Sequence, residues 1–110
     1  MGREFRTIVL DGEESKSALA NYLRTRRDTQ VHDRNIAEIS LAEGPEVTGV
    51  VILVEPLLNG RDKIDLSQED IVEAIVAFLQ EKAHPLPRRG RKSLTWIKGD
   101  LAMLVELDWF

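Results

Sequence analysis

The stretch Val47-Thr48-Gly49-Val50-Val51-Ile52-Leu53-Val54 is the longest apolar run in the chain, and the other elements are arranged around it. It is rich in β-branched residues, and the turn residues Gly44-Pro45 and Pro56 flank it, which favours a strand over a buried helix. Successive side chains of a strand alternate between two faces, and here both faces are apolar. The pattern therefore predicts a central strand that is covered on both sides.

The segments before this strand extend the prediction toward the N-terminus. Residues 36–42 alternate apolar and polar side chains, and the turn at residues 43–46 separates them from residues 47–54, so the two segments predict a hairpin. Residues 5–10 are also apolar enough for a first strand. Residues 56–64 contain Asn59-Gly60, a tight-turn sequence, and predict either a short hairpin or a loop.

The C-terminal part of the chain predicts a second hairpin. Residues 93–98 and 101–110 have the composition of strands. Gly99-Asp100 lies between them and fits a two-residue turn with glycine in its first central position.

Two helices are indicated by the residues at their starts. Asp11 and Glu14 have capping-box spacing for a helix that runs to about residue 27. Ser67 and Asp70 have the same spacing for a second helix, which should end near residue 83 because Pro85 disfavours helical backbone in the residue before it. The second helix carries an apolar stripe at helical spacing, formed by Ile71, Val72, Ile75, Phe78 and Leu79.

The order of these elements is strand, helix, strand, strand, helix, strand, strand. Without the last strand it is βαββαβ, the ferredoxin-like pattern. We expect one α+β domain over residues 1–110, a two-layer sandwich with two helices on one face of a mainly antiparallel sheet and an added C-terminal strand. Many unrelated functions share this fold, so the function has to be argued from a site.

Composition excludes several classes of protein. The chain of 110 residues has 43% hydrophobic and 31% charged residues, a balance typical of one globular domain. Its net charge of -4 gives no general attraction to nucleic acid or anionic membranes. It has no cysteine, which excludes disulfides and thiolate chemistry. We expect no signal peptide, no membrane helix and a cytoplasmic protein.

A basic segment is the strongest charge feature. Residues 84–92 combine prolines and a glycine with positive charge, which predicts an exposed basic loop. Three interpretations stay open: a solvated loop beside an acidic helix, docking on an acidic protein surface, or contact with nucleic-acid phosphates while an aromatic ring stacks on a base. The nucleic-acid alternative would use Arg88, Arg89, Arg91, Lys92, Trp96 and Lys98.

Apolar side chains that the predicted helices do not cover point to a protein partner. One face of residues 47–54 is accounted for by the helix stripe, whereas the other has only Leu104 and the aromatic tail to meet it. A second copy or another protein would cover this face. The predicted partner-binding residues are Arg88, Arg89, Arg91, Lys92, Val50, Ile52, Val54, Leu104, Trp109 and Phe110.

The sequence supports no metal or cofactor site and no catalytic motif. The acids near residues 62–70 do not have the spacing of a calcium loop, and helix capping explains several of them. We therefore expect a small non-enzymatic protein-binding domain, such as an accessory or regulatory subunit or a homo-oligomer. The weaker alternative is an enzyme with a site at an oligomer interface, for which the polar candidates are Tyr22, His32, Asp33 and His84.

Overall fold

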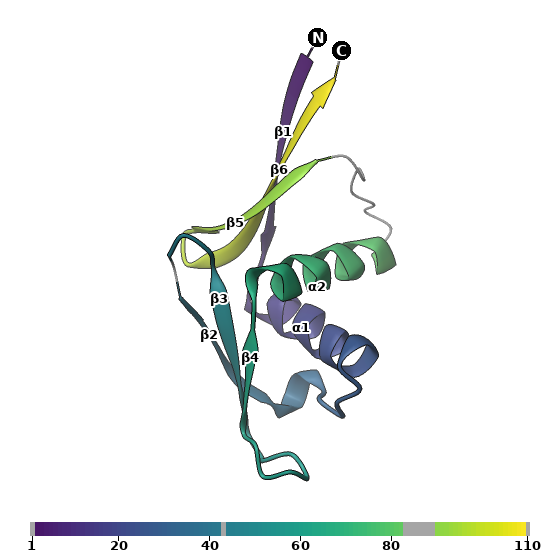
Figure 1. The fold of residues 1–110 in the computed structure, drawn as a ribbon, viewed down its shortest axis with the longest axis vertical. Helices are drawn as coiled ribbons and strands as arrows, with labels where there is room; N and C mark the ends of the chain where they lie inside the picture. The colour runs from purple at the N-terminus through teal and green to yellow at the C-terminus, as the bar shows by residue number, and fades with distance from the viewer. Residues whose placement is uncertain (1, 43, 83–89, 110) are drawn as a thin grey trace.

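The computed structural model describes residues 2–42, 44–82 and 90–109 of the chain. The fold is α+β, with two α-helices and two antiparallel sheets of three strands each (Figure 1). In chain order the elements are β1 (Gly2–Leu10), α1 (Gly12–Arg26), the short 3-10 helix η1 (Asp33–Asn35), β2 (Ile36–Ala42), β3 (Thr48–Leu53), β4 (Lys63–Leu66), α2 (Gln68–Glu81), β5 (Arg91–Ile97) and β6 (Asp100–Trp109).

The two sheets have the strand orders β1-β6-β5 and β2-β3-β4. The single sheet expected from the sequence does not form among the described strands, and the ferredoxin-like order is not confirmed. The strand β4 explains this difference. It lies in the segment for which the sequence predicted either a short hairpin or a loop. β4 pairs with one side of β3 and β2 with the other. Both sides of β3 are therefore occupied, and β1 pairs with β6 instead.

The helices join the two sheets into one core. α1 and α2 pack against each other; α1 contacts β1, β2 and β6, whereas α2 contacts β3, β4 and β5. The buried apolar residues of all these elements form one cluster. Its largest fully buried side chains are Leu10, Leu19, Leu23, Val31, Val51, Ile71, Ile75, Met103 and Val105.

Both predicted capping boxes are confirmed. The backbone N–H of Glu14 donates to Asp11 Oδ1 at 2.8 Å, and the N–H of Asp11 donates to Glu14 Oε1 at 3.2 Å. At α2 the N–H of Asp70 donates to Ser67 Oγ at 3.2 Å, and the N–H of Ser67 donates to Asp70 Oδ2 at 2.9 Å. Local sequence therefore fixes where each helix begins.

The β5–β6 turn lies one residue earlier than predicted. Ile97 pairs with Asp100, so the two central residues are Lys98 and Gly99. Both have positive φ, 53° and 84°. A two-residue hairpin of type I′ requires positive φ at both positions, which explains why Gly99 takes the second position.

The two faces of β3 differ in burial. Gly49, Val51 and Leu53 are buried on the face toward the helices, whereas Val50 and Ile52 are only half-buried on the other. Within this chain the second face is therefore covered only in part, and its coverage by a partner stays a prediction. The strands that flank β3 supply polar side chains to this second face: Glu38, Ser40, Lys63 and Asp65.

The β1–β6 pair extends beyond the helices and gives the molecule an elongated shape of 53 × 27 × 19 Å. The pairing runs from Gly2↔Trp109 to Leu10↔Leu101. Figure 1 shows both ends of the chain together at the tip of this pair. β5 pairs with β6 as far as Arg91↔Glu106, so the tip is a ribbon of two strands among the residues that the structure describes.

Candidate interaction surface

The outer face of the β1-β6-β5 sheet carries exposed apolar side chains. Met103 and Val105 on β6 are buried against the core, so their neighbour Leu104 points outward and is 38% exposed. The register pairs Leu104 with Thr7, which places Phe5 and Val9 on the same outer face. Phe5 is 66% exposed and Val9 is 43% exposed. We call Phe5, Val9 and Leu104 the outer apolar patch.

Charged residues of both signs border this patch. Arg3 forms an ion pair with Glu106, with 3.4 Å between Arg3 Nε and Glu106 Oε1. Arg91 on β5 lies opposite Glu106 in the sheet register and is exposed. An apolar centre with a charged, solvent-accessible rim is the usual composition of a protein–protein contact surface.

Only part of this patch was predicted from the sequence. Leu104 was predicted as a partner-binding residue, but Phe5 and Val9 were not. Their outward direction depends on the register of β1 against β6, and that pairing joins residues at opposite ends of the chain. The signal that could have found them is alternation: Ile8 and Leu10 are the apolar residues of the inner face, so the odd-numbered residues of β1 must face outward.

The predicted apolar face of residues 47–54 is separate from Leu104. Val50 and Ile52 lie on β3 in the second sheet, whereas Leu104 lies on β6 in the first. Val54 follows β3 and is 62% exposed. Leu104 and the second face of this strand therefore belong to different sheets, and the expected contact between them stays a prediction.

The basic residues do not share one surface in the part of the chain that the structure describes. Arg91 and Lys92 are consecutive in β5 and therefore point to opposite faces. Lys92 lies beside Glu69 and Glu73 of α2 in a shallow depression. Lys98 is in the turn at the other end of β5, roughly 20 Å along the strand from Arg91.

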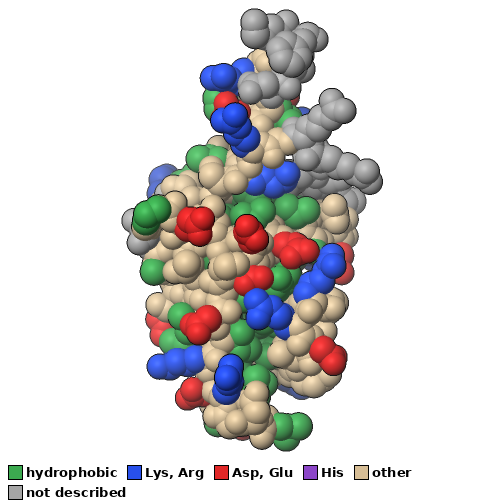
Figure 2. All heavy atoms as spheres, in the orientation of Figure 1, with side chains coloured by type: hydrophobic (Ala, Val, Ile, Leu, Met, Phe, Trp, Pro, Cys, Tyr) green, Lys and Arg blue, Asp and Glu red, His purple; other side chains and the backbone are tan. Residues whose placement is uncertain are grey.

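Several predicted site residues fall outside this description. Arg88, Arg89, His84 and Phe110 lie outside the described residues. Trp96 and Trp109 belong to β5 and β6 by their backbones, and their side chains also lie outside the description. Figure 2 shows acidic and basic side chains interspersed over the face in view.

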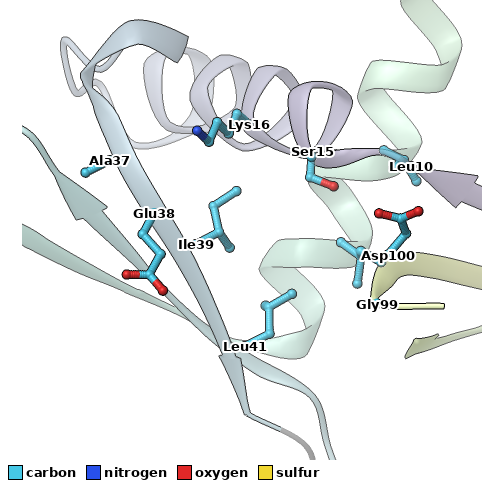
Figure 3. A pocket seen from close by; sticks show the side chains of 11 residues that line it. Leu10, Ser15, Lys16, Ala37, Glu38, Ile39, Leu41, Gly99 and Asp100 are labelled. Carbon is cyan, nitrogen blue, oxygen red and sulfur yellow. The ribbon is translucent and has the colours of Figure 1, made fainter. Parts of the chain in front are cut away.

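A pocket of about 290 Å³ lies between the two sheets, beside the start of α1. Figure 3 shows Ile39 and Leu41 projecting from β2 toward α1 and the β5–β6 turn, while Glu38 projects the other way. Lys16 and Asp100 also line the pocket. Charges of both signs around an apolar floor do not select one class of ligand.

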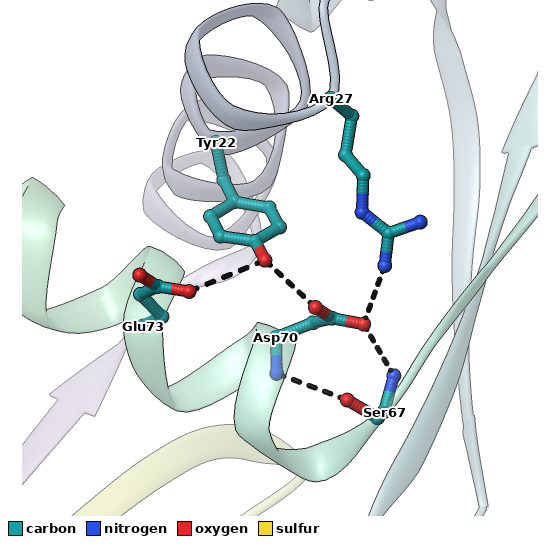
Figure 4. A network of polar contacts seen from close by, with 5 residues as sticks. All are labelled: Tyr22, Arg27, Ser67, Asp70 and Glu73. Atoms are coloured by element: carbon teal, nitrogen blue, oxygen red, sulfur yellow. Dashed lines mark hydrogen bonds and ion pairs between the residues drawn. The ribbon is translucent and has the colours of Figure 1, made fainter.

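Tyr22, a candidate for the enzyme alternative, belongs to a polar network between the helices (Figure 4). Its hydroxyl donates to Asp70 Oδ1 at 2.7 Å and to Glu73 Oε2 at 3.3 Å. Arg27 donates from its guanidinium to Asp70 Oδ2 at 2.8 Å. The network fastens the end of α1 to the start of α2.

The same network shifts the pKa values of Asp70 and Tyr22. Burial alone would raise the pKa of Asp70, but the Ser67 amide, the Tyr22 hydroxyl and the Arg27 guanidinium outweigh burial and lower this pKa to about 2. Burial and the hydrogen bond to Asp70 raise the pKa of Tyr22. A tyrosine held in its protonated form by a structural carboxylate is poorly suited to act as a general base.

Two other polar candidates, His32 and Asp33, lie at η1. His32 is exposed, and Asp33 accepts a hydrogen bond from Ser17 Oγ at 2.5 Å. Within the described ranges, no group of three or more His, Asp or Glu side chains is placed to share a metal ion.

Comparisons with protein-family models, with curated proteins and with solved structures find no match to this chain. Neither described helix is long and apolar enough to cross a membrane. The outer apolar patch is the surface feature of the described residues that points most directly to a function.

Proposed function

We propose that this chain is a small non-enzymatic protein-binding domain, an accessory or assembly subunit that docks a protein on the outer face of the β1-β6-β5 sheet. The observation that carries the proposal is the outer apolar patch, in which Phe5, Val9 and Leu104 are exposed on one face of a regular sheet. The absence of cysteine suits a reducing, cytoplasmic setting for this role.

The size of the patch limits how tightly it binds alone. Fully burying an apolar side chain contributes roughly 1.5–3 kcal/mol, and Val9 and Leu104 are already more than half buried, so the three together supply roughly 3–5 kcal/mol. Association of two proteins costs roughly 4–15 kcal/mol in lost translational and rotational freedom. The patch therefore needs support from neighbouring polar or backbone contacts.

The test is affinity capture with matched variants of the purified domain. The double variant Val9→Thr/Leu104→Thr makes two of the three patch residues polar, and threonine is β-branched and suited to a strand. Leu58→Ser removes a fully exposed leucine from the loop between β3 and β4 and serves as the control. We expect partner proteins to bind wild type and Leu58→Ser equally, and to lose binding to the double variant. Equal capture by all three would contradict the proposed surface.

A further inference from the structure

The strand β1 lies at the edge of its sheet and pairs on one side only among the described strands. The sheet order is β1-β6-β5, so β6 satisfies one side of β1 over its nine residues. An edge strand presents a row of unpaired N–H and C=O groups on its other side, which is a template for a further strand. Of the features that protect edge strands, β1 lacks a bulge and a proline but carries the charged residues Arg3, Glu4 and Arg6.

The tip of the β1–β6 pair gives a reason for such an addition. Beyond Arg91↔Glu106, the pairing among the described strands is that of β1 with β6. A two-stranded ribbon is marginally stable in water and gains stability from a third strand or a packed face. Phe5, the most exposed member of the outer apolar patch, lies in the part of β1 next to this ribbon.

The charges of β1 are self-complementary in one antiparallel register. A two-fold axis perpendicular to the sheet keeps the two outer faces on the same side. In the register centred on Phe5, Glu4 lies opposite the partner's Arg6, and Arg6 lies opposite the partner's Glu4. The two adjacent registers that also keep the faces aligned are centred on Glu4 or on Arg6, and each places two like charges at the axis. Like charges directly opposite each other destabilise a sheet.

The geometry within one copy supports this register. Arg6 Nε lies 2.7 Å from Glu4 Oε1, so both side chains occupy the same face and extend toward each other. A second such pair across the axis produces four alternating charges. On the outer face the same register brings Phe5 beside the partner's Phe5 and joins the two outer apolar patches.

We infer that the partner of this sheet is a second copy of the chain, added antiparallel along the β1 edge with Phe5 at the two-fold axis to form a continuous six-stranded sheet. The inference rests on the proposed function, because it names the protein that the same sheet binds. Backbone pairing along the edge supplies the contacts that the outer apolar patch lacks by itself.

Charge-swap variants test the register by sedimentation equilibrium over a wide range of protein concentration. Glu4→Arg and Arg6→Glu each turn two attractive cross-axis pairs into repulsive ones, and we expect each to raise the dimer dissociation constant by about tenfold or more. The double variant Glu4→Arg/Arg6→Glu restores opposite charges and should return the dissociation constant to near the wild-type value. Mixing the two single variants should also restore association, because all cross-axis pairs are then opposite in sign.

The controls reverse the same charges far from β1. Glu55→Arg and Arg61→Glu lie in the loop between β3 and β4 and should leave the dimer unchanged. Far-UV circular dichroism and urea midpoints establish that every variant is folded; Glu4 and Arg6 are 40% and 48% exposed, so their reversal should leave the fold intact.

The outcomes separate this inference from the proposed function. If both single variants lose dimerisation, and the double variant and the mixture recover it, the result supports pairing along the β1 edge in the register centred on Phe5. A wild-type protein that stays monomeric at every concentration overturns the inference, and the capture experiment with Val9→Thr/Leu104→Thr still decides the proposed function. If the charge reversals leave the dimer dissociation constant unchanged but Val9→Thr/Leu104→Thr dissociates the dimer, the edge pairing is overturned. That result supports binding by the outer face.

Discussion

Asp70 is the residue whose ionisation contributes most clearly to stability. Its pKa in the folded state is about 2, below its ordinary value of 3.8, because it accepts hydrogen bonds from Ser67, Tyr22 and Arg27. A lowered pKa means that its contribution is present above about pH 4 and is lost as the pH falls toward 2. The shift corresponds to about 2 kcal/mol of unfolding free energy at neutral pH.

The substitution Asp70→Asn should therefore lower the free energy of unfolding by about 2 kcal/mol at pH 7 and much less at pH 2. Urea unfolding at both pH values measures this difference. Asp65→Asn, at an exposed position on β4, is the matched control and should change stability by less than about 0.5 kcal/mol. A loss for Asp70→Asn that is the same at both pH values would show that the carboxylate charge is not responsible.

Local residues such as Asp11, Glu14, Ser67 and Asp70 could be predicted from the sequence because their partners are three positions away. The contacts of Asp70 with Tyr22 and Arg27 could not, since they span 48 and 43 positions and depend on the packing of α1 against α2. The capping role of Asp70 could therefore be predicted from the sequence, whereas its contacts between the two helices could not.

At the scale of a strand, the alternation in β6 predicts opposite consequences for neighbouring residues. Met103 is fully buried, so Met103→Ala should lower the free energy of unfolding by about 2–5 kcal/mol. Leu104 is on the outer face, and Leu104→Ala should cost less than about 1 kcal/mol. Chemical denaturation of the two variants measures the difference, and similar losses for both would contradict the register of β6.

Because β3 packs closely against α2, a larger side chain at position 49 should lower the free energy of unfolding. A Cβ there would lie 2.8 Å from Leu41 Cδ2 and 3.3 Å from Ile71 Cδ1, and Ile71 is fully buried. Gly49→Val should therefore lower the free energy of unfolding by about 1–3 kcal/mol. Gly12 at the start of α1 has open space around it, and Gly12→Ala should leave stability unchanged or raise it by about 0.4–1 kcal/mol. Thermal melts of both variants provide the comparison, and a Gly49→Val protein as stable as wild type would contradict the close packing.

Most strands and both helices could be predicted because their patterns are local. The exception was β4, whose four residues follow Asn59-Gly60 and are too short to show a clear alternation. β4 forms by pairing with β3. This pairing depends on two segments together, so neither segment's own sequence predicts it.

For the whole molecule, the division into two sheets was the feature that the sequence could not supply. Strands of the expected type and order can still pair with different neighbours. Here β2 and β4 occupy the two sides of β3, and β1 pairs with β6. This pairing joins the two ends of the chain and turns Phe5, Val9 and Leu104 to the same side. The candidate site is a consequence of topology, which explains why only Leu104 of its three apolar members was predicted.

Photo-crosslinking from the outer face shows whether this surface contacts a second copy of the chain. Replacing Phe5 with benzoyl-phenylalanine keeps an aromatic side chain at the centre of the proposed contact. We expect a light-dependent adduct between two copies of the chain, and little adduct when the same group replaces Leu58 in the loop between β3 and β4. No adduct from position 5, or equal adducts from positions 5 and 58, would contradict a contact between two copies of the chain centred on Phe5.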